Sequence, residues 1–217
     1  MSFYGAYGKR CFDLCAASLG IVAIAPILIA AGAAVAFTSA GPVFFRQERV
    51  GKDGKRFRIF KFRTMYVHRE AADSQLTASG DSRITPVGRW LRSSKIDELA
   101  QLFNVVKGEM SLVGPRPEVP KYVAAYNSAQ RTVLSVRPGV TGPAANMLEE
   151  ELLAGQADKE RFYLTNVLPA KLAIDCAYCG NVTFRGDLRL ILSTVSKVVR
   201  RIGELCRPVA PVSHNRV

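Results

Sequence analysis

Two acidic residues, Asp97 and Glu98, lie side by side in the segment RSSKIDELAQLFNV, residues 92–105. Neighbours in a helix differ by about 100° around its axis, so the two carboxylates are expected to point in different directions. A carboxylate can attack a phosphate as a nucleophile. Ser94 has N-cap spacing, three residues before Asp97, and acids are favoured in a first helical turn. The spacing by itself therefore favours a capping role for Asp97, which does not exclude chemistry.

Basic residues flank this acidic pair in the sequence. Arg92 precedes it, and with the helix N-terminus it is expected to keep Asp97 ionised. Residues 114–117, GPRP, predict a rigid turn that presents Arg116 between two prolines. A fixed guanidinium suits a bidentate grip on phosphate, although an isolated PRP is also typical of an extended linker. Together these residue types indicate chemistry on a phosphate.

The composition bounds the function further. The chain has 217 residues and a formal net charge of +12, which implies an anionic partner such as nucleic acid, lipid headgroups or a phosphorylated substrate. It has two histidines, so histidine-centred catalysis is disfavoured. Its five cysteines include a single CxxC, and we interpret them as reduced thiols. P-loop, GxGxxG, HExxH and GxSxG motifs are absent.

An apolar segment must be placed before the acidic pair. Residues 14–37 contain no charge and, as one helix, would be about 36 Å long, enough to cross a bilayer core. Pro26 lies in its middle, where it should kink or break the helix. Both flanks are basic, and the positive-inside rule would keep both on the cytoplasmic face. We expect a re-entrant helix broken at Pro26; an ordinary single span is the alternative.

The remaining elements follow from turn and cap signals. Residues 43–63 predict a β-hairpin with its turn at 51–54, and the helix that carries Asp97 should end at Gly108. The expected class is α/β, mostly helical with a small β-hairpin. We expect a re-entrant membrane helix over 1–40, a compact cytoplasmic catalytic domain with interfacial amphipathic helices over 41–205, and a disordered tail over 206–217.

The ordered set of motifs resembles the bacterial sugar transferase family, the small monotopic phosphoglycosyl transferases. The resemblance covers roughly residues 9–200 and rests on four stretches: KRCFD at 9–13, GPVFFRQERVGKDGKRFRIFKFRTM at 41–65, ITPVGRWLRSSKIDELAQLFNVVKGEMSLVGPRPE at 84–118, and RPGVTG at 137–142. It implies transfer of a sugar-1-phosphate from a UDP-sugar to polyprenyl (undecaprenyl) phosphate, with release of UMP. It also implies a covalent aspartyl-phosphosugar intermediate.

The same resemblance implies roles for individual residues. Asp97 would be the nucleophile, and Glu98 would be the Mg²⁺ ligand and a proton acceptor. Pro26 would break the membrane helix. The residues carried over as phosphate contacts are Arg92, Arg116, Lys61 and Arg63. The departure of residues 143–153 from the family pattern indicates that sugar specificity cannot be transferred from better-known members.

The implied location is the cytoplasmic face of the bacterial inner membrane, in contact with phospholipid, with both ends of the membrane helix cytoplasmic. The product would initiate a surface glycan, exopolysaccharide or lipopolysaccharide. No nucleic-acid partner is expected, since no nucleic-acid-binding motif is recognisable, and a homodimer stays open. The alternative function is a non-catalytic, membrane-anchored module that binds anions through its basic surface.

Overall fold

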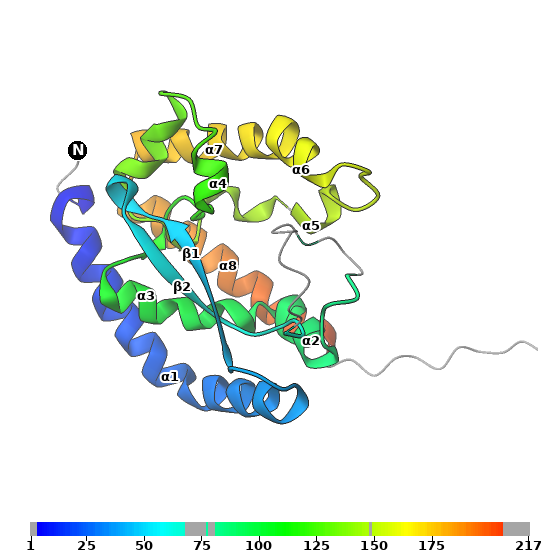
Figure 1. Cartoon of the computed structure of the whole chain (residues 1–217). Helices are drawn as coiled ribbons and strands as arrows, with labels where there is room; N and C mark the ends of the chain where they lie inside the picture. Colours follow the sequence, from blue (N-terminus) through cyan, green and yellow to red (C-terminus); the bar gives the residue numbers. More distant parts are fainter. Residues whose placement is uncertain (1–3, 68–76, 78–80, 148, 206–217) are drawn as a thin grey trace, which may run out of the picture.

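The computed structural model describes residues 4–67, 77, 81–147 and 149–205 (Figure 1). These residues are mostly helical and contain two small two-stranded sheets. The expected mostly helical class with a small hairpin is therefore confirmed, and a second, parallel strand pair is added to it. The expected tail over 206–217 lies outside the described residues, and the domain boundary at residue 40 stays a prediction.

The apolar segment forms α1, Lys9–Thr38, after a π-helical turn at Tyr4–Gly8. Among the described residues, α1 is the one helix that is long and apolar enough to cross a membrane. Pro26 lies inside it, and the helix bends along its length instead of ending there (Figure 1). An interior proline removes one backbone hydrogen bond and crowds the preceding turn, so a bend is its ordinary effect. At Pro26 the helix therefore bends and does not break. The re-entrant path of this helix through a membrane stays a prediction.

The predicted hairpin consists of β1, Phe44–Val50, and β2, Arg56–Phe62, which pair antiparallel. Its turn at Lys52–Gly54 is a short 3₁₀ turn in which Asp53 has a φ of 57°. The outer edge of β2 is closed by Asn104, which accepts from the Phe60 N–H (2.9 Å) and donates to the Arg58 carbonyl (2.9 Å). The Asn104 amide replaces a missing strand partner and holds its helix against the hairpin.

The helix before the acidic pair is α2, Pro86–Ser94, which begins at the proline. Its N-cap is Thr85, whose hydroxyl accepts from the Gly88 N–H (2.8 Å). A Cβ at position 88 would lie 2.0 Å from the Thr64 carbonyl oxygen. Glycine is required there because α2 lies directly on the chain that leaves β2.

The expected N-cap role of Ser94 is wrong. Ser94 is the last residue of α2, and its hydroxyl donates back to the Trp90 (2.8 Å) and Leu91 (3.1 Å) carbonyls. Lys95 then adopts a left-handed conformation with a φ of 60° and turns the chain into a new helix. That helix is 3₁₀ over Ile96–Gln101 and continues as α3, Leu102–Lys107, where Gly108 ends it as predicted.

Two glycine-rich loops meet behind the hairpin. β3, Ser111–Val113, pairs in parallel with β4, Gly139–Thr141. A Cβ on Gly139 would lie 2.1 Å from the Gly114 nitrogen, so only glycine permits this approach. The pairing brings the 114–117 turn beside the loop that follows β4, although 25 residues separate Gly114 from Gly139.

The rest of the described chain wraps around these strands, with α7 across the hairpin from α1 (Figure 1). The start of α8 lies against the start of α1, where Lys9 pairs with Asp187 and the Phe12 ring packs edge-to-face on Phe184. Short helical turns connect the longer helices. Their bounds are α4 Pro120–Val123, a 3₁₀ helix Gln130–Ser135, a 3₁₀ helix Pro143–Asn146, α5 Glu149–Leu152, α6 Lys159–Phe162, a π-helical turn Tyr163–Val167, α7 Leu168–Gly180 and α8 Phe184–Leu205.

One face of α1 packs on this body at both ends of the helix. Ala17 lies in a cluster with Phe57 and Val105, and Ala31 lies in another with Phe62 and Leu91. Other large apolar side chains of α1 are exposed to the outside of the body. Those exposed are Leu14, Leu19, Val22, Ile27, Ile29 and Phe37.

Polar contacts fix the start of α1. The Arg10 guanidinium donates to the carbonyls of Val105 (2.6 Å) and Val106 (3.1 Å), near the end of α3. Asp13 Oδ1 accepts from the Leu112 N–H in β3 (3.1 Å). The KRCFD motif thus has a structural role: it ties the apolar helix to the end of α3 and to β3.

Candidate active site

Asp97 and Glu98 lie in the first turn of the 3₁₀ helix, as the sequence predicts. Lys95 places this turn without any side-chain cap, and the Glu98 N–H donates to the Lys95 carbonyl (3.3 Å). Asp97 is buried, with 7% of the residue exposed. Its Oδ1 has no hydrogen-bond partner among the described residues. Asp97 is therefore not a capping residue, and the capping alternative is wrong because the local backbone is turned by Lys95.

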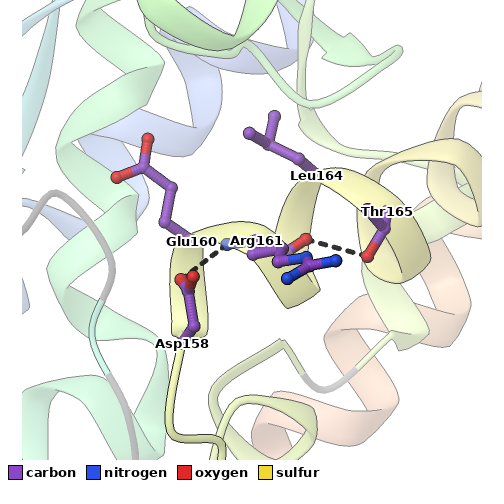
Figure 2. A pocket seen from close by; sticks show the side chains of 5 residues that line it. All are labelled: Asp158, Glu160, Arg161, Leu164 and Thr165. Atoms are coloured by element: carbon purple, nitrogen blue, oxygen red, sulfur yellow. Dashed lines mark hydrogen bonds between the residues drawn. The ribbon is translucent and has the colours of Figure 1, made fainter.

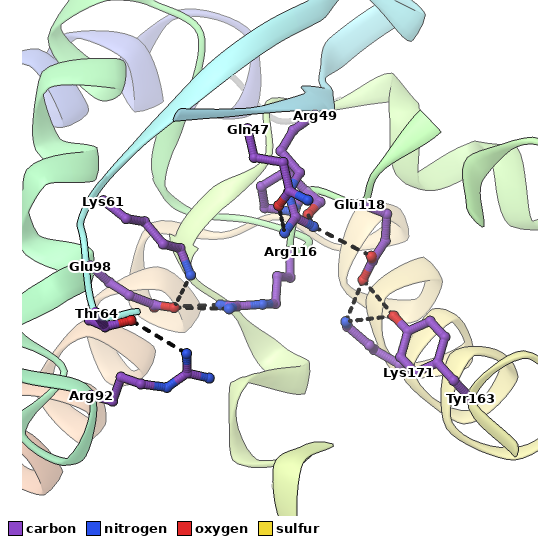
Figure 3. A network of polar contacts seen from close by, with 11 residues as sticks. Gln47, Arg49, Lys61, Thr64, Arg92, Glu98, Arg116, Glu118, Tyr163 and Lys171 are labelled. Atoms are coloured by element: carbon purple, nitrogen blue, oxygen red, sulfur yellow. Dashed lines mark hydrogen bonds and ion pairs between the residues drawn. The ribbon is translucent and has the colours of Figure 1, made fainter. Parts of the chain in front are cut away.

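Glu98 is held between two cations from distant parts of the chain. Its Oε1 accepts from the Lys61 Nζ of β2 (2.7 Å) and from the Arg116 Nη2 of the turn after β3 (2.9 Å) (Figure 3). The Glu98 and Lys61 side chains are 14% and 17% exposed, whereas that of Arg116 is 40% exposed. The structure thus brings both cations to the acidic pair, and the Arg116 side chain is the most exposed of the three.

The two carboxylates titrate in opposite directions. Burial raises the pKa of Asp97 to about 6, with the Glu98 charge adding to the rise and Lys61, Lys95 and Arg92 opposing it. Burial also disfavours ionised Glu98, but the charges of Arg116 and Lys61 outweigh it and hold the Glu98 pKa well below its ordinary range. The expectation that Asp97 stays ionised is therefore correct only above about pH 6, because burial dominates over the nearby cations. Neighbouring carboxylates with separated pKa values are typical of sites that give them different jobs.

The two remaining predicted phosphate contacts lie in different surroundings. The Arg92 guanidinium lies near the acidic pair, with Nη1 donating to Thr64 Oγ1 (3.5 Å) (Figure 3). The Arg63 guanidinium does not join the cluster. It is buried and donates to the carbonyl (2.6 Å) and hydroxyl (2.8 Å) of Ser39 and to the Pro42 carbonyl. In this position Arg63 satisfies carbonyls at the end of α1.

A second polar network lies on the other side of the PRP turn. Glu118 is buried and accepts from the Lys171 Nζ of α7 (2.6 Å) and from the Tyr163 hydroxyl (2.8 Å). Arg49 of β1 donates to the Pro117 carbonyl (3.0 Å), and its guanidinium lies 3.7 Å from Glu118 (Figure 3). Sequence reasoning missed Lys171 and Arg49 as members of the site region. Glu118 belongs to the PRPE motif, but nothing local identifies its partner 53 residues later.

The acidic pair is compatible with a magnesium ion that arrives with its substrate. Among the described residues, no group of three or more Asp, Glu, His or Cys side chains is placed to hold a metal. Mg²⁺ commonly takes only one or two protein carboxylates and completes its shell with water and substrate phosphates. Ionised Glu98 and the unpartnered Oδ1 of buried Asp97 meet that requirement.

A surface hollow elsewhere has no part in this cluster. Its volume is about 360 Å³, and it lies over α6 and the π-helical turn (Figure 2). Asp158 at its rim accepts from the Arg161 N–H (2.9 Å) as the N-cap of α6. None of the predicted site residues lines it; the lining residues are Asp158, Glu160, Arg161, Leu164 and Thr165.

Comparison with known proteins finds one matching family and several relatives. A family model described as bacterial sugar transferase matches residues 4–201. The chain is 35% identical over 201 residues to a UDP-N-acetylgalactosamine-undecaprenyl-phosphate N-acetylgalactosaminephosphotransferase of Aeromonas hydrophila, covering 91% of this chain and 45% of that protein. It is 36% identical to a UDP-glucose:undecaprenyl-phosphate glucose-1-phosphate transferase of Caulobacter vibrioides, covering 88% and 69%. It is 32% identical to the exopolysaccharide production protein ExoY of Sinorhizobium fredii, covering 89% and 86%. The chain thus spans less than half of the first of these relatives and most of the third.

Proposed function

Since this chain belongs to the bacterial sugar transferase family, we propose that it transfers a sugar-1-phosphate from a UDP-sugar to undecaprenyl phosphate. The reaction takes place at the cytoplasmic face of the inner membrane and initiates a surface glycan or exopolysaccharide. The relatives' names support this donor and acceptor class, since they carry UDP-sugar and undecaprenyl phosphate in their descriptions. The sugar itself differs between those relatives, which leaves the donor of this chain to experiment.

The first step is a displacement at phosphorus by Asp97. One carboxylate oxygen attacks the β-phosphorus of the UDP-sugar, and a bond forms to Asp97. The bond between that phosphorus and the bridging oxygen breaks, and UMP leaves with the electron pair. An aspartyl-phosphosugar remains on the enzyme. Asp97 suits this role because its Oδ1 is unpartnered and its pKa of about 6 leaves it ionised at neutral pH.

The second step returns Asp97 to its starting state. A phosphate oxygen of undecaprenyl phosphate attacks the same phosphorus, and the Asp97 carboxylate leaves, giving undecaprenyl diphosphate sugar. Arg116, Lys61 and Arg92 offset the negative charge of the phosphates in both steps. Glu98 would hold Mg²⁺, which would supply positive charge to offset that of the phosphates. Lys61 and Arg116 keep Glu98 ionised and oriented for this contact.

The path of α1 supports a membrane element whose ends lie on one side. A helix that simply crossed a bilayer core of about 30 Å would carry its two ends to opposite faces. Here Arg10 attaches the start of α1 to α3, and Arg63 attaches its end to the chain that leaves the hairpin. The helix also carries several large apolar side chains that are exposed outside that body. We therefore place both ends of α1 on the cytoplasmic face, with the bend at Pro26 embedded among the lipids.

The observation that carries the proposal is the pair of neighbouring carboxylates with unlike surroundings. Asp97 is buried with an unpartnered oxygen, and Glu98 is clasped by Lys61 and Arg116. A non-catalytic anion-binding module has no need for a buried carboxylate beside its cations, because that charge would oppose anion binding.

The test is UMP release by the full-length chain in detergent or nanodiscs. A panel of UDP-sugars is supplied with Mg²⁺, with and without undecaprenyl phosphate. We expect one donor class to give continuous UMP release with acceptor, and about one UMP per enzyme without it. Asp97→Asn should abolish both, EDTA should suppress both, and Asp53→Asn on the exposed hairpin turn should change neither.

Two outcomes would overturn parts of this proposal. An active Asp97→Asn variant would remove Asp97 as the nucleophile. No UMP release from any donor, together with salt-sensitive binding to anionic vesicles, would instead establish the anion-binding module.

A further inference from the structure

The Arg49 guanidinium meets the PRP turn, residues 115–117, and is used by none of the steps above. It extends from β1, and the Arg49 side chain is 17% exposed. Its Nη1 donates to the Pro117 carbonyl (3.0 Å) and lies 3.7 Å from Glu118 Oε2 (Figure 3). Its Nη2 donates to the Gln47 side chain (2.7 Å). Because a guanidinium is planar, acceptors at both Nη atoms fix its position and its plane.

Carbonyl groups connect the PRP turn to its neighbours. Pro115 and Pro117 carry no N–H group, so their carbonyls are the backbone groups with which they can bond another element. The Pro115 carbonyl accepts from the Gly139 N–H of β4 (2.9 Å), and the Pro117 carbonyl accepts from Arg49 (3.0 Å). Arg116 therefore lies between two fixed carbonyls. A backbone group holds the first, and the Arg49 side chain holds the second.

The acidic neighbour of Arg49 is fixed as well. The Glu118 carboxylate accepts from the Lys171 Nζ of α7 (2.6 Å) and from the Tyr163 hydroxyl (2.8 Å). The Glu118 backbone carbonyl accepts from the Val50 N–H of β1 (2.9 Å). These bonds attach the chain just after the turn to the hairpin and to α7. Arg49 thus lies in rigid surroundings and can transmit that rigidity to the Pro117 carbonyl.

One face of the hairpin meets both partners of the Arg116–Glu98 ion pair. The antiparallel register places positions 49 and 61 on the same face of the two strands. Lys61 donates to Glu98 (2.7 Å), and Arg49 donates to the residue that follows Arg116. The Arg116 Nη2 then reaches Glu98 Oε1 at 2.9 Å. The hairpin therefore sets the position of the turn relative to Glu98 through Arg49 and Lys61.

We propose that Arg49 is a positioning residue that sets the Arg116 guanidinium against Glu98 and the donor diphosphate by holding the Pro117 carbonyl. The inference rests on the phosphate-binding role of Arg116 in the proposed function. A guanidinium placed by a rigid turn loses little entropy on binding, whereas one on a loosened turn loses more. Removing the Arg49 donors should therefore weaken diphosphate binding through Arg116.

The test is a double-mutant cycle on UDP binding, with the full-length chain in detergent and UDP as the probe in a calorimetric titration. Arg116→Ala is expected to weaken UDP binding about tenfold. Arg49→Met keeps an apolar stem without donors and should weaken it by about the same factor. The double variant should bind no more weakly than Arg116→Ala, because Arg49 acts through Arg116.

Two further variants separate positioning from general loss of stability. Arg49→Lys keeps one cationic donor but cannot bond Gln47 and Pro117 together, so it should weaken UDP binding about threefold. Tyr163→Phe is the matched control, because it removes a hydrogen bond from Glu118 and leaves the bond between Arg49 and Pro117 in place. It should lower the thermal midpoint and bind UDP within about twofold of the wild type. Circular dichroism checks that each variant is folded.

The outcomes separate this inference from the proposed function. If Arg116→Ala binds UDP as the wild type does, Arg116 is no phosphate ligand, and the inference falls with that assignment. If Arg116→Ala weakens binding but the effect of Arg49→Met is absent or adds in full to it, only the positioning role is overturned. A loss in Tyr163→Phe as large as in Arg49→Met also overturns it. If Arg49→Met does not fold, Arg49→Lys decides: its loss must be present and must disappear in the Arg116→Ala background.

Discussion

Asp97→Asn is expected to stabilise the protein above pH 6 while abolishing its activity. Burial, together with the Glu98 charge, raises the pKa of Asp97 from 3.8 to about 6. Each unit by which the Asp97 pKa rises corresponds to about 1.4 kcal/mol. Ionised Asp97 therefore destabilises the folded state by about 3 kcal/mol. Below pH 3.8 the carboxyl is neutral in both states and costs nothing; the cost grows up to about pH 6 and is constant above it. An asparagine avoids the charge but still buries an amide, so we expect a net gain of about 1–3 kcal/mol.

The measurement is thermal unfolding of both proteins in detergent with EDTA, so that no metal contributes, between pH 4.5 and pH 8. For a chain of this length, 1 kcal/mol shifts Tm by about 2–4 °C, which predicts a rise of roughly 2–12 °C at pH 8. At pH 4.5 the charge cost falls to about 1 kcal/mol, so the stability difference should be smaller there by about 2 kcal/mol. Asp53→Asn is the matched control, because it lies in the exposed hairpin turn with a φ that asparagine tolerates.

Two results would refute this reasoning. If the Asp97→Asn protein is no more stable than the wild type at pH 8, burial of the ionised Asp97 carboxylate does not destabilise the folded state. A gain that persists unchanged at pH 4.5 would mean that the substitution acts through packing and not through charge.

Three further predictions follow from named contacts. Because Asp97 acts ionised and burial raises its pKa to about 6 in the free protein, kcat/KM for UMP release, measured as initial rates at limiting donor, should be about tenfold lower at pH 5 than on its plateau above pH 7. Lys171→Met leaves buried Glu118 without its closest cation and should cost about 3–5 kcal/mol in chemical unfolding, part of which Glu118→Gln in the same chain restores. Gly139→Ala places a Cβ 2.1 Å from a backbone nitrogen and should prevent recovery of folded protein by size exclusion, whereas Gly180→Ala, with open space around it, should not.

The hairpin and the helix ends could be predicted from the sequence where a glycine or proline at that point fixes the local backbone. The hairpin follows from alternating β-formers around a Gly-flanked turn, and the end of α3 follows from Gly108, which takes a φ of 86°. Pro86 similarly begins α2. In each case the special backbone conformation needs a residue that is rare elsewhere, so its identity is informative.

The start of the dyad helix could not be predicted by the same means. Ser94 has the sequence signature of a cap, yet α2 runs through it and Lys95 makes the turn instead. What decides the outcome is the contact of α2 with the chain after β2, where Gly88 lies against the Thr64 carbonyl. That contact joins residues 24 positions apart in the sequence, so a local capping rule cannot register it.

The roles of the basic residues show the same limit. Arg63 and Lys61 are equally plausible phosphate contacts by type, but one meets the carbonyls at the end of α1 and the other meets Glu98. A guanidinium serves either purpose, and only the tertiary position distinguishes them. Nothing in the sequence marks Lys171 or Asp175 as a buried residue, because a charged residue on a helix is usually solvated.

Three consecutive residues at the end of the hairpin connect the membrane helix to the proposed chemistry. Lys61 pairs with Glu98, Phe62 is buried in the cluster that contains Ala31 of α1, and Arg63 bonds Ser39 beyond the end of α1. The distance between the apolar helix and the carboxylate pair is therefore set by a rigid stretch of chain and not by a flexible linker. In the proposed function, the phosphate of the acceptor would lie at the headgroup plane with its chain in the lipid, and a site at a fixed height over the apolar helix would meet that phosphate without lifting the lipid out of the bilayer. The KFR segment would then set that height, although only Lys61 approaches the acidic pair.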